Sequence, residues 1–244
     1  MASPVGTLMR HWRRERRMSQ LVLATEMGTT QRHVSFVESG RAEPSRELVL
    51  RVARALDVPL RERNQLLLAA GYAPQYRETG LDAPALSQVQ RALDRMLAQQ
   101  EPYPAVVMDH HWDIQQANAA ATALFTCLLD GPPPEPANVI RLMFGPLRPH
   151  VANFDATGDA LLARVYREAV GGVPDPRTQA LLEEIRPDAP PDFARPASPV
   201  VPVHFVKDDL DVRYFSLVTT VGTPQDVTLQ EIRVELFFPA DRVS

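Results

Sequence analysis

The stretch Ser19–Gly40 constrains the fold most, because it carries the start and stop signals of two short helices with a tight turn between them. Ser19 can cap the first helix, since its side-chain oxygen can accept from the free amides of a first turn. Gly28 provides the backbone freedom for a sharp stop, the two threonines after it offer a second cap, and Gly40 closes the second helix. Apolar residues follow both caps at helical spacing: Leu21, Leu23, Ala24 and Met27, then Val34, Phe36 and Val37. This pattern predicts a helix-turn-helix.

Spacing alone leaves two interpretations of this helical pair open. Helical pairs with a glycine turn also occur in all-α cores. The second helix, however, begins with polar side chains that suit base edges and phosphates in a DNA major groove. These side chains are Gln31, Arg32, His33 and Ser35.

The charge distribution favours DNA binding. Residues 1–79 contain thirteen arginines and eight acidic residues, a net charge of +5. The remaining residues contain thirteen basic and twenty-two acidic residues, a net charge of −9, and the two parts give the −4 of the whole chain. A basic part joined to an acidic part is expected of a nucleic-acid reader with a separate second function.

Residues throughout the first seventy positions resemble the phage-repressor (XRE-type) DNA-binding domain. The matching residues are Leu8, Arg13, Met18-Ser19-Gln20, Leu23-Ala24, Gly28-Thr29-Thr30-Gln31, Val34-Ser35, Glu38-Ser39-Gly40-Arg41, Pro44, Leu48, Ala53 and Leu56-Asp57-Val58. The resemblance implies that Arg13 and Glu38 form a structural ion pair and that Gln20 touches a phosphate. It also implies that the segment beginning at Thr30 reads bases.

Two further segments resemble the MmyB-like transcription regulators, which join such a domain to a PAS-like ligand-binding domain. One runs from Pro59 to Pro74, with Leu67-Leu68-Ala69-Ala70-Gly71-Tyr72 at its centre, and the other from Gly222 to Asp241. The resemblance therefore spans nearly the whole chain. It implies a fatty-acid-like ligand for the second domain.

We expect an α+β protein with two domains. Residues 1–73 form five short helices, residues 74–85 a linker, and residues 86–244 a PAS-like domain with a five-stranded antiparallel sheet and helices. Apolar residues from Leu86 to Leu97 form a helical stripe that either packs on its own domain or contributes to a dimer. Asn118 is expected to cap a helix, and Gly222-Thr223-Pro224 to form a hairpin turn. A proline-rich loop is expected over Pro187–Pro199.

The predicted DNA contacts fall into two groups. Phosphate contacts are expected from Arg10, Arg14, Gln20, Thr29, His33 and Arg41. Base contacts are expected from Thr30, Gln31, Arg32 and Ser35.

A PAS-like sheet with helices over one face can enclose an apolar cavity, which is a usual small-molecule site. The residues expected to line it are Leu124, Leu142, Phe144, Phe205, Phe215 and Leu217. Arg141 could face an anionic ligand group from the rim. The more common position for a single arginine is paired with a loop carboxylate or extended into water.

These expectations describe a homodimeric regulator that binds a double-stranded DNA operator and senses a small apolar, fatty-acid-like ligand. The alternative is a regulator whose second domain only dimerises or binds a protein. An enzyme is disfavoured because the sequence contains no nucleophile elbow, Cys–His pair, phosphate loop or paired-carboxylate pattern. No cofactor is expected.

Metal binding and membrane insertion are also not expected. His110 and His111 lie beside Asp109, but adjacent residues in a turn are expected to point apart. The lone Cys127 has apolar helical neighbours, which indicates a buried thiol without a disulfide. No stretch is long and apolar enough to span a bilayer, and no signal peptide is recognisable, so a cytoplasmic location is expected.

Overall fold

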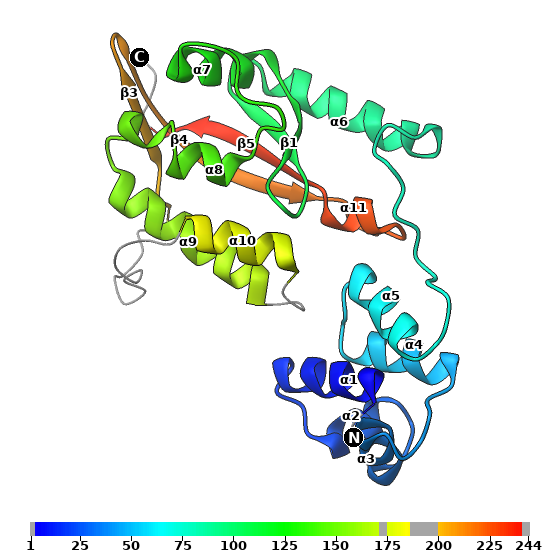
Figure 1. Cartoon of the computed structure of the whole chain (residues 1–244). Helices are drawn as coiled ribbons and strands as arrows, with labels where there is room; N and C mark the ends of the chain where they lie inside the picture. The colour runs from blue at the N-terminus through cyan, green and yellow to red at the C-terminus, as the bar shows by residue number, and fades with distance from the viewer. Residues whose placement is uncertain (1–2, 171–174, 186–199, 241–244) are drawn as a thin grey trace. The chain divides into compact units, whose positions relative to one another are not determined.

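The computed structural model describes residues 3–170, 175–185 and 200–240. The chain divides into two compact units, shown with all their elements in Figure 1. The first comprises Met1–Thr79 and Thr223–Gln230, and the second comprises Gly80–Gly222 and Glu231–Ser244. The loop expected over Pro187–Pro199 lies outside the described residues.

Five helices precede residue 80, as the sequence predicts. They are α1 (Pro4–Glu15), α2 (Gln20–Glu26), α3 (Gln31–Ser39), α4 (Arg46–Ala55) and α5 (Leu60–Ala69). Side-chain oxygens cap the first four, each accepting from the amide three residues further on at 3.1–3.2 Å: Ser3, Ser19, Thr30 and Ser45. Gly28 and Gly40 end α2 and α3 with φ of 63° and 75°, a region that a residue with a Cβ rarely adopts.

One apolar core holds these helices together. Trp12 of α1, Leu23 of α2, Val34 of α3 and Leu56 at the end of α4 are all fully buried in it. Helix α1 approaches α3 closely at Gly6, where a Cβ would lie 2.6 Å from the carbonyl oxygen of Val37. The helix-turn-helix is therefore set rigidly against the rest of the unit.

The second unit is built on an antiparallel sheet. Its strands are β1 (Ala105–Met108), β2 (Ile114–Ala117), β3 (Val203–Lys207), β4 (Leu210–Thr220) and β5 (Arg233–Pro239). Their order in the sheet is β2-β1-β5-β4-β3. This is the five-stranded antiparallel sheet expected for the second domain, and the α+β class is confirmed.

Helices cover both faces of this sheet (Figure 1). On one face lie α7 (Ala119–Leu129), α8 (Val139–Phe144), α9 (Phe154–Val170) and α10 (Pro176–Glu184), with η2 (Arg148–His150) between α8 and α9. On the other face, η1 (Pro84–Leu86) leads into α6 (Ser87–Gln100), whose Leu93 and Leu97 pack against Val107 and Val234. The apolar stripe of α6 thus packs on its own unit.

Asn118 caps α7, as expected. Its Oδ1 accepts from the amides of Ala121 and Ala105, both at 2.9 Å. Its Nδ2 donates to the carbonyl oxygens of Tyr103 at 2.8 Å and Leu97 at 3.3 Å. One buried amide group thereby ties α6, β1 and α7 together.

Two local predictions are wrong. The connection from β4 to β5 is not a tight hairpin, because it contains α11 (Val227–Glu231), whose first turn is capped by Asp226 Oδ1 accepting from the Thr228 amide at 3.0 Å. Cys127 is exposed rather than buried. The side of α7 that faces the core carries Ala121, Phe125 and Leu128, and Cys127 falls on the other side.

Candidate nucleic-acid interface and apolar interior

Helix α3 presents its N-terminal turn to solvent. Thr30, Gln31 and Arg32 are exposed, and His33 and Ser35 are half-buried. The guanidinium groups of Arg32 and Arg41 lie over the ring of Phe36, at 5.0 and 5.8 Å from its centroid. The sequence folds this way locally because Thr30 caps the helix, while Val34 and Val37 are buried and fix its rotation.

A buried carboxylate fixes α3 against α1 and α2. Glu38 has a side chain only 1% exposed, and Arg13 binds it through Nε to Oε1 at 2.6 Å and Nη2 to Oε2 at 3.0 Å. Gln20 Nε2 donates to Glu38 Oε2 at 2.9 Å, and Arg10 Nη2 donates to the Glu38 carbonyl oxygen at 2.8 Å. Arg13 also donates through Nη1 to the carbonyl oxygen of Met18 at 2.8 Å.

The electrostatics of this cluster favour the charged forms. Burial by itself raises the pKa of Glu38, but hydrogen bonds from Arg13 and Gln20 and the charges of Arg13 and Arg10 outweigh it, so the pKa lies below its ordinary value. The hydrogen bond that Arg13 donates to Glu38 raises the pKa of Arg13. The pair expected from the sequence is thus a buried, multiply bonded ion pair.

The side chains expected to touch phosphates occupy different positions. Arg14 and Arg41 are exposed, and Thr29 is half-buried near the turn. Arg10 and Gln20 both bind Glu38, so part of their hydrogen-bonding capacity is used inside the unit. The Arg10 side chain nevertheless remains 36% exposed.

Arg16 has a role that the sequence analysis did not assign. Its Nε donates to the Leu56 carbonyl oxygen at 2.8 Å and its Nη2 to the Asp57 carbonyl oxygen at 2.7 Å. It therefore binds the free carbonyl groups at the C-terminus of α4. A basic residue forty positions away from a helix end gives no signal of such a contact in the sequence.

The residues expected to line an apolar cavity do not all come together. Leu142 and Phe205 are buried in the larger apolar cluster of the second unit, and Leu124 and Phe144 pack against it. Phe215 and Leu217 lie on the opposite face of the sheet. They pair with Phe238 and Leu236 of β5, and Leu217 is 53% exposed.

The error has a simple geometric cause. Successive residues of a strand point to opposite faces, and the sequence does not say which set faces the helices of the larger cluster. In β4 that set contains Val212 and Tyr214, because these pair with Phe205 and Val203 of β3. The odd-numbered neighbours Phe215 and Leu217 therefore face the other way.

Arg141 pairs with a carboxylate, which was one of its two expected positions. Its Nε lies 2.8 Å from Glu184 Oε2 of α10. Both side chains are substantially exposed.

A buried polar cluster that the sequence analysis missed lies on the face of the sheet that α7, α8, α9 and α10 cover. Glu235 of β5 is buried, accepts from Ser216 Oγ at 2.5 Å and lies 3.4 Å from Arg164 Nη1 of α9. The Arg164 guanidinium stacks over the ring of Trp112 at 4.4 Å from its centroid, with Arg233 over the same ring at 5.6 Å. The available signal was Glu235, a charged residue in the apolar run of β5.

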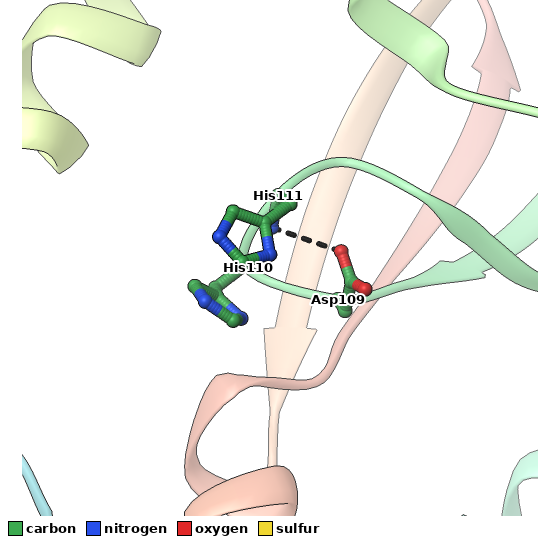
Figure 2. Close-up of side chains that lie close together, drawn as sticks. All are labelled: Asp109, His110 and His111. Carbon is green, nitrogen blue, oxygen red and sulfur yellow. Dashed lines mark hydrogen bonds between the residues drawn. The ribbon is translucent and has the colours of Figure 1, made fainter. Parts of the chain in front are cut away.

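The turn between β1 and β2 brings together three side chains of metal-binding types, one aspartate and two histidines. Figure 2 shows the imidazole rings of His110 and His111 side by side. The centroids of the two rings are 3.7 Å apart. The expectation that these adjacent side chains point apart is wrong. Asp109 shapes the turn, since its Oδ1 accepts from the amides of His111 at 2.9 Å and Asp113 at 3.0 Å, and Trp112 adopts a positive φ of 70°.

Comparison with known proteins assigns both units. Residues 9–63 match the helix-turn-helix family model, and residues 89–244 match the model of the MmyB-like transcription regulator ligand binding domain. The fold and its exposed helix therefore define a DNA-binding transcription regulator with a ligand-binding domain, which is not an enzyme family. The chain belongs to the MmyB-like transcription regulators.

Other comparisons add little. No curated protein matches the chain. Among solved structures, an RNA-binding light-oxygen-voltage receptor is similar, with 12% sequence identity and a TM-score of 0.32. The match covers 97% of this chain and 58% of the receptor. Among the described residues, none of the helices has the length and apolar character needed to span a membrane.

Proposed function

We propose that this protein is a homodimeric, sequence-specific regulator in which α3 reads bases in the major groove of an operator. The observation that carries the proposal is the exposed polar first turn of α3, on a helix held by the buried Glu38 cluster. Thr30, Gln31 and Arg32 are the most exposed of the proposed base-reading residues, with Ser35 one turn further along. Because the backbone of the helix is already fixed, little backbone freedom is lost when its side chains form hydrogen bonds with the operator.

Phosphate contacts around α3 complete the proposed interface. Arg14 and Arg41 are exposed cations on either side of the helix-turn-helix in sequence, and Thr29 and His33 flank the cap of α3. Arg10 and Gln20 would use the hydrogen-bonding groups that Glu38 leaves available. Such contacts strengthen binding to any sequence and position the reading helix.

Two copies are proposed because one small domain buries too little surface for tight specific binding. A symmetric dimer would read two half-sites about 34–36 Å apart. An apolar strip on the sheet face opposite the larger helical cluster supports self-association. It consists of Phe215 stacked on Phe238, with Leu217 two residues further along β4 and 53% exposed.

The second unit is proposed to bind a small apolar, fatty-acid-like molecule among the helices that cover the sheet. Support comes from the family to which the chain belongs and from the large apolar cluster that contains Leu142 and Phe205. The same cluster adjoins the pair formed by half-buried Arg164 and buried Glu235, which could orient a polar end group. A ligand that favours one dimer geometry would change operator affinity by about 1–3 kcal/mol of coupling.

The β4–β5 connection is a candidate route for this coupling. Although it joins two strands of the sheet, Thr223–Gln230 forms part of the compact unit that contains the helix-turn-helix. Asp226 Oδ2 accepts from Thr79 Oγ1 at 2.6 Å, and Gln230 Oε1 accepts from the amide of Leu60 at 2.6 Å, at the start of α5. A shift at the ends of β4 and β5 would act directly on these bonds.

DNA binding is tested by operator selection and fluorescence anisotropy with the double variant Gln31→Ala/Arg32→Ala. Each lost base contact removes about 1–3 kcal/mol of discrimination, so we expect about 5- to 150-fold less discrimination per position between the selected operator and variants of it. Arg14→Ala is the matched control. It should weaken binding to all duplexes alike. The slope of log affinity against log salt concentration should become shallower by about one, as expected for one lost phosphate contact. Unchanged specificity in the double variant would show that α3 does not read the operator.

Ligand binding is tested separately by native mass spectrometry of the purified full chain. A co-purifying acyl lipid at a fixed ratio per protomer is expected. A dimer that carries no added mass and shows no shift in melting temperature with added fatty acids would instead support a second domain that only dimerises. Monomers at micromolar concentration would contradict the proposed dimer.

A further inference from the structure

The strongest unassigned feature of the second unit is the cluster of Asp109, His110 and His111 at the turn between β1 and β2 (Figure 2). A carboxylate oxygen and one ring nitrogen from each histidine lie within 4.8 Å of one another. All three residues are half-buried, so a bound ion would be partly shielded from water.

Each histidine is oriented by a carboxylate from another part of the unit. His110 Nδ1 lies 2.9 Å from Glu231 Oε2, and His111 Nε2 lies 3.2 Å from Asp175 Oδ1. A neutral imidazole that donates one N–H to a carboxylate presents a lone pair at its other nitrogen. The arrangement leaves His110 Nε2 and His111 Nδ1 as the coordinating atoms.

This pattern is typical of metal sites, where a ligating histidine usually donates its second ring nitrogen to a carboxylate or carbonyl group. His110 and His111 are adjacent, and the carboxylate of Asp109 lies beside them. Together the three side chains offer two nitrogens and one oxygen to an ion. Imidazole and carboxylate together suit Zn²⁺, whose bonds to both are about 2.0–2.2 Å long. With such bonds the ligand atoms of a tetrahedral site lie about 3.4 Å apart, so side-chain rotations have to bring together three atoms that already lie within 4.8 Å of one another.

The turn itself can tolerate ligation by Asp109. Its Oδ1 holds the amides of His111 and Asp113, and its Oδ2 accepts from Gln115 Nε2 at 3.2 Å. A carboxylate has about four lone-pair positions, so one remains for a cation. The backbone that carries both histidines is therefore already fixed before an ion binds.

From this geometry we propose that Asp109, His110 and His111 form a Zn²⁺-binding site on the second unit, with Glu231 and Asp175 as positioning residues. The bound ion would hold the two histidines of the β1–β2 turn in place. His110 binds Glu231 at the end of α11, and His111 binds Asp175 at the start of α10. The ion would complete a link between three elements that are separated in sequence.

The test uses the untagged full chain after dialysis against a chelator, titrated with ZnCl₂ by calorimetry at pH 7.5. One Zn²⁺ per chain with micromolar or tighter affinity is expected, and the melting temperature should rise with added Zn²⁺ but not with added Mg²⁺. His110→Gln and His111→Gln should each weaken binding at least tenfold. Asp109→Asn should do the same, because its carbonyl oxygen still holds the turn while the anionic ligand is lost.

Two further variants separate the roles. Glu231→Gln should weaken binding about 10- to 100-fold, as for other residues that orient a ligating histidine. His204→Gln is the matched control, because His204 Nε2 also meets a carboxylate, Asp211 Oδ1 at 2.7 Å, but among the described residues His204 belongs to no group of three metal-binding side chains. It should leave Zn²⁺ affinity unchanged.

A measurement on the wild-type protein tests the site even if the variants do not fold. Zn²⁺ should protect His110 and His111, but not His204, from modification by diethylpyrocarbonate, mapped by peptide mass spectrometry. The proposal is overturned if stoichiometric binding is absent. It is equally overturned if the His110→Gln/His111→Gln protein binds Zn²⁺ like wild type, or if protection is equal at all three histidines.

Discussion

Removing the carboxylate of Glu38 should destabilise the DNA-binding unit more than any exposed substitution in it. The side chain is 1% exposed and binds Arg13 at 2.6 and 3.0 Å and Gln20 at 2.9 Å. The Arg13 side chain is itself only 12% exposed. In Glu38→Ala its guanidinium still donates to the Met18 carbonyl oxygen but has lost the negative charge that balanced it. Breaking a buried pair in this way costs about 3–5 kcal/mol.

That cost is a large share of the stability of a small domain, which is about 5–15 kcal/mol in total. With about 4–8 °C per kcal/mol for 60–100 residues, the melting transition of this unit should fall by at least roughly 12 °C. Urea denaturation followed by tryptophan fluorescence and circular dichroism measures the loss. The chain has two tryptophans, Trp12 in the first unit and Trp112 in the second, so fluorescence reports on both.

Two variants make the result specific. Glu43→Ala removes the same charge from an exposed position of the same unit and should change stability by no more than about 0.5 kcal/mol. The double variant Arg13→Met/Glu38→Leu removes both charges and should recover much of the loss, because no unpaired buried ion remains. A loss below about 1 kcal/mol in Glu38→Ala would refute the argument that the pair is buried and mutually dependent.

The remaining predictions follow from single contacts. Because the pKa of Glu38 is lowered on folding, its contribution to stability is complete above its ordinary value of 4.5 and is lost as the pH falls through the folded value. Urea denaturation at a series of pH values, followed by circular dichroism, should therefore show the first unit losing stability as the pH falls below about 4.5. Gly6→Ala should cost about 1–3 kcal/mol in thermal melts, since its Cβ would meet a backbone oxygen at 2.6 Å, whereas Gly131→Ala, with open space around it, should melt like wild type. Asn118→Ala should cost about 2–4 kcal/mol in the second unit, measured by urea denaturation, because it removes a helix cap and leaves the Ala105 amide without its partner; a loss under about 0.5 kcal/mol would contradict that role.

Local signals in the sequence determined much of the first unit. Ser3, Ser19, Thr30 and Ser45 cap the helices they precede, and Gly28 and Gly40 end them with positive φ. These signals can be predicted because a cap depends only on residues within one helical turn. The exposed first turn of α3 follows from the same local rules.

Only the tertiary structure decided how distant residues meet. Phe215 and Leu217 face away from Phe205 because the register between β3 and β4 assigns the faces, and a strand's own alternation does not specify which face is which. Arg164 meets Glu235 across seventy residues, and His110 and His111 are oriented by carboxylates from α11 and the start of α10. Such contacts depend on where whole elements pack. The sequence therefore determined the helices, the sheet and the exposed first turn of α3, while packing decided which side chains form the interior of the second unit and its candidate metal site.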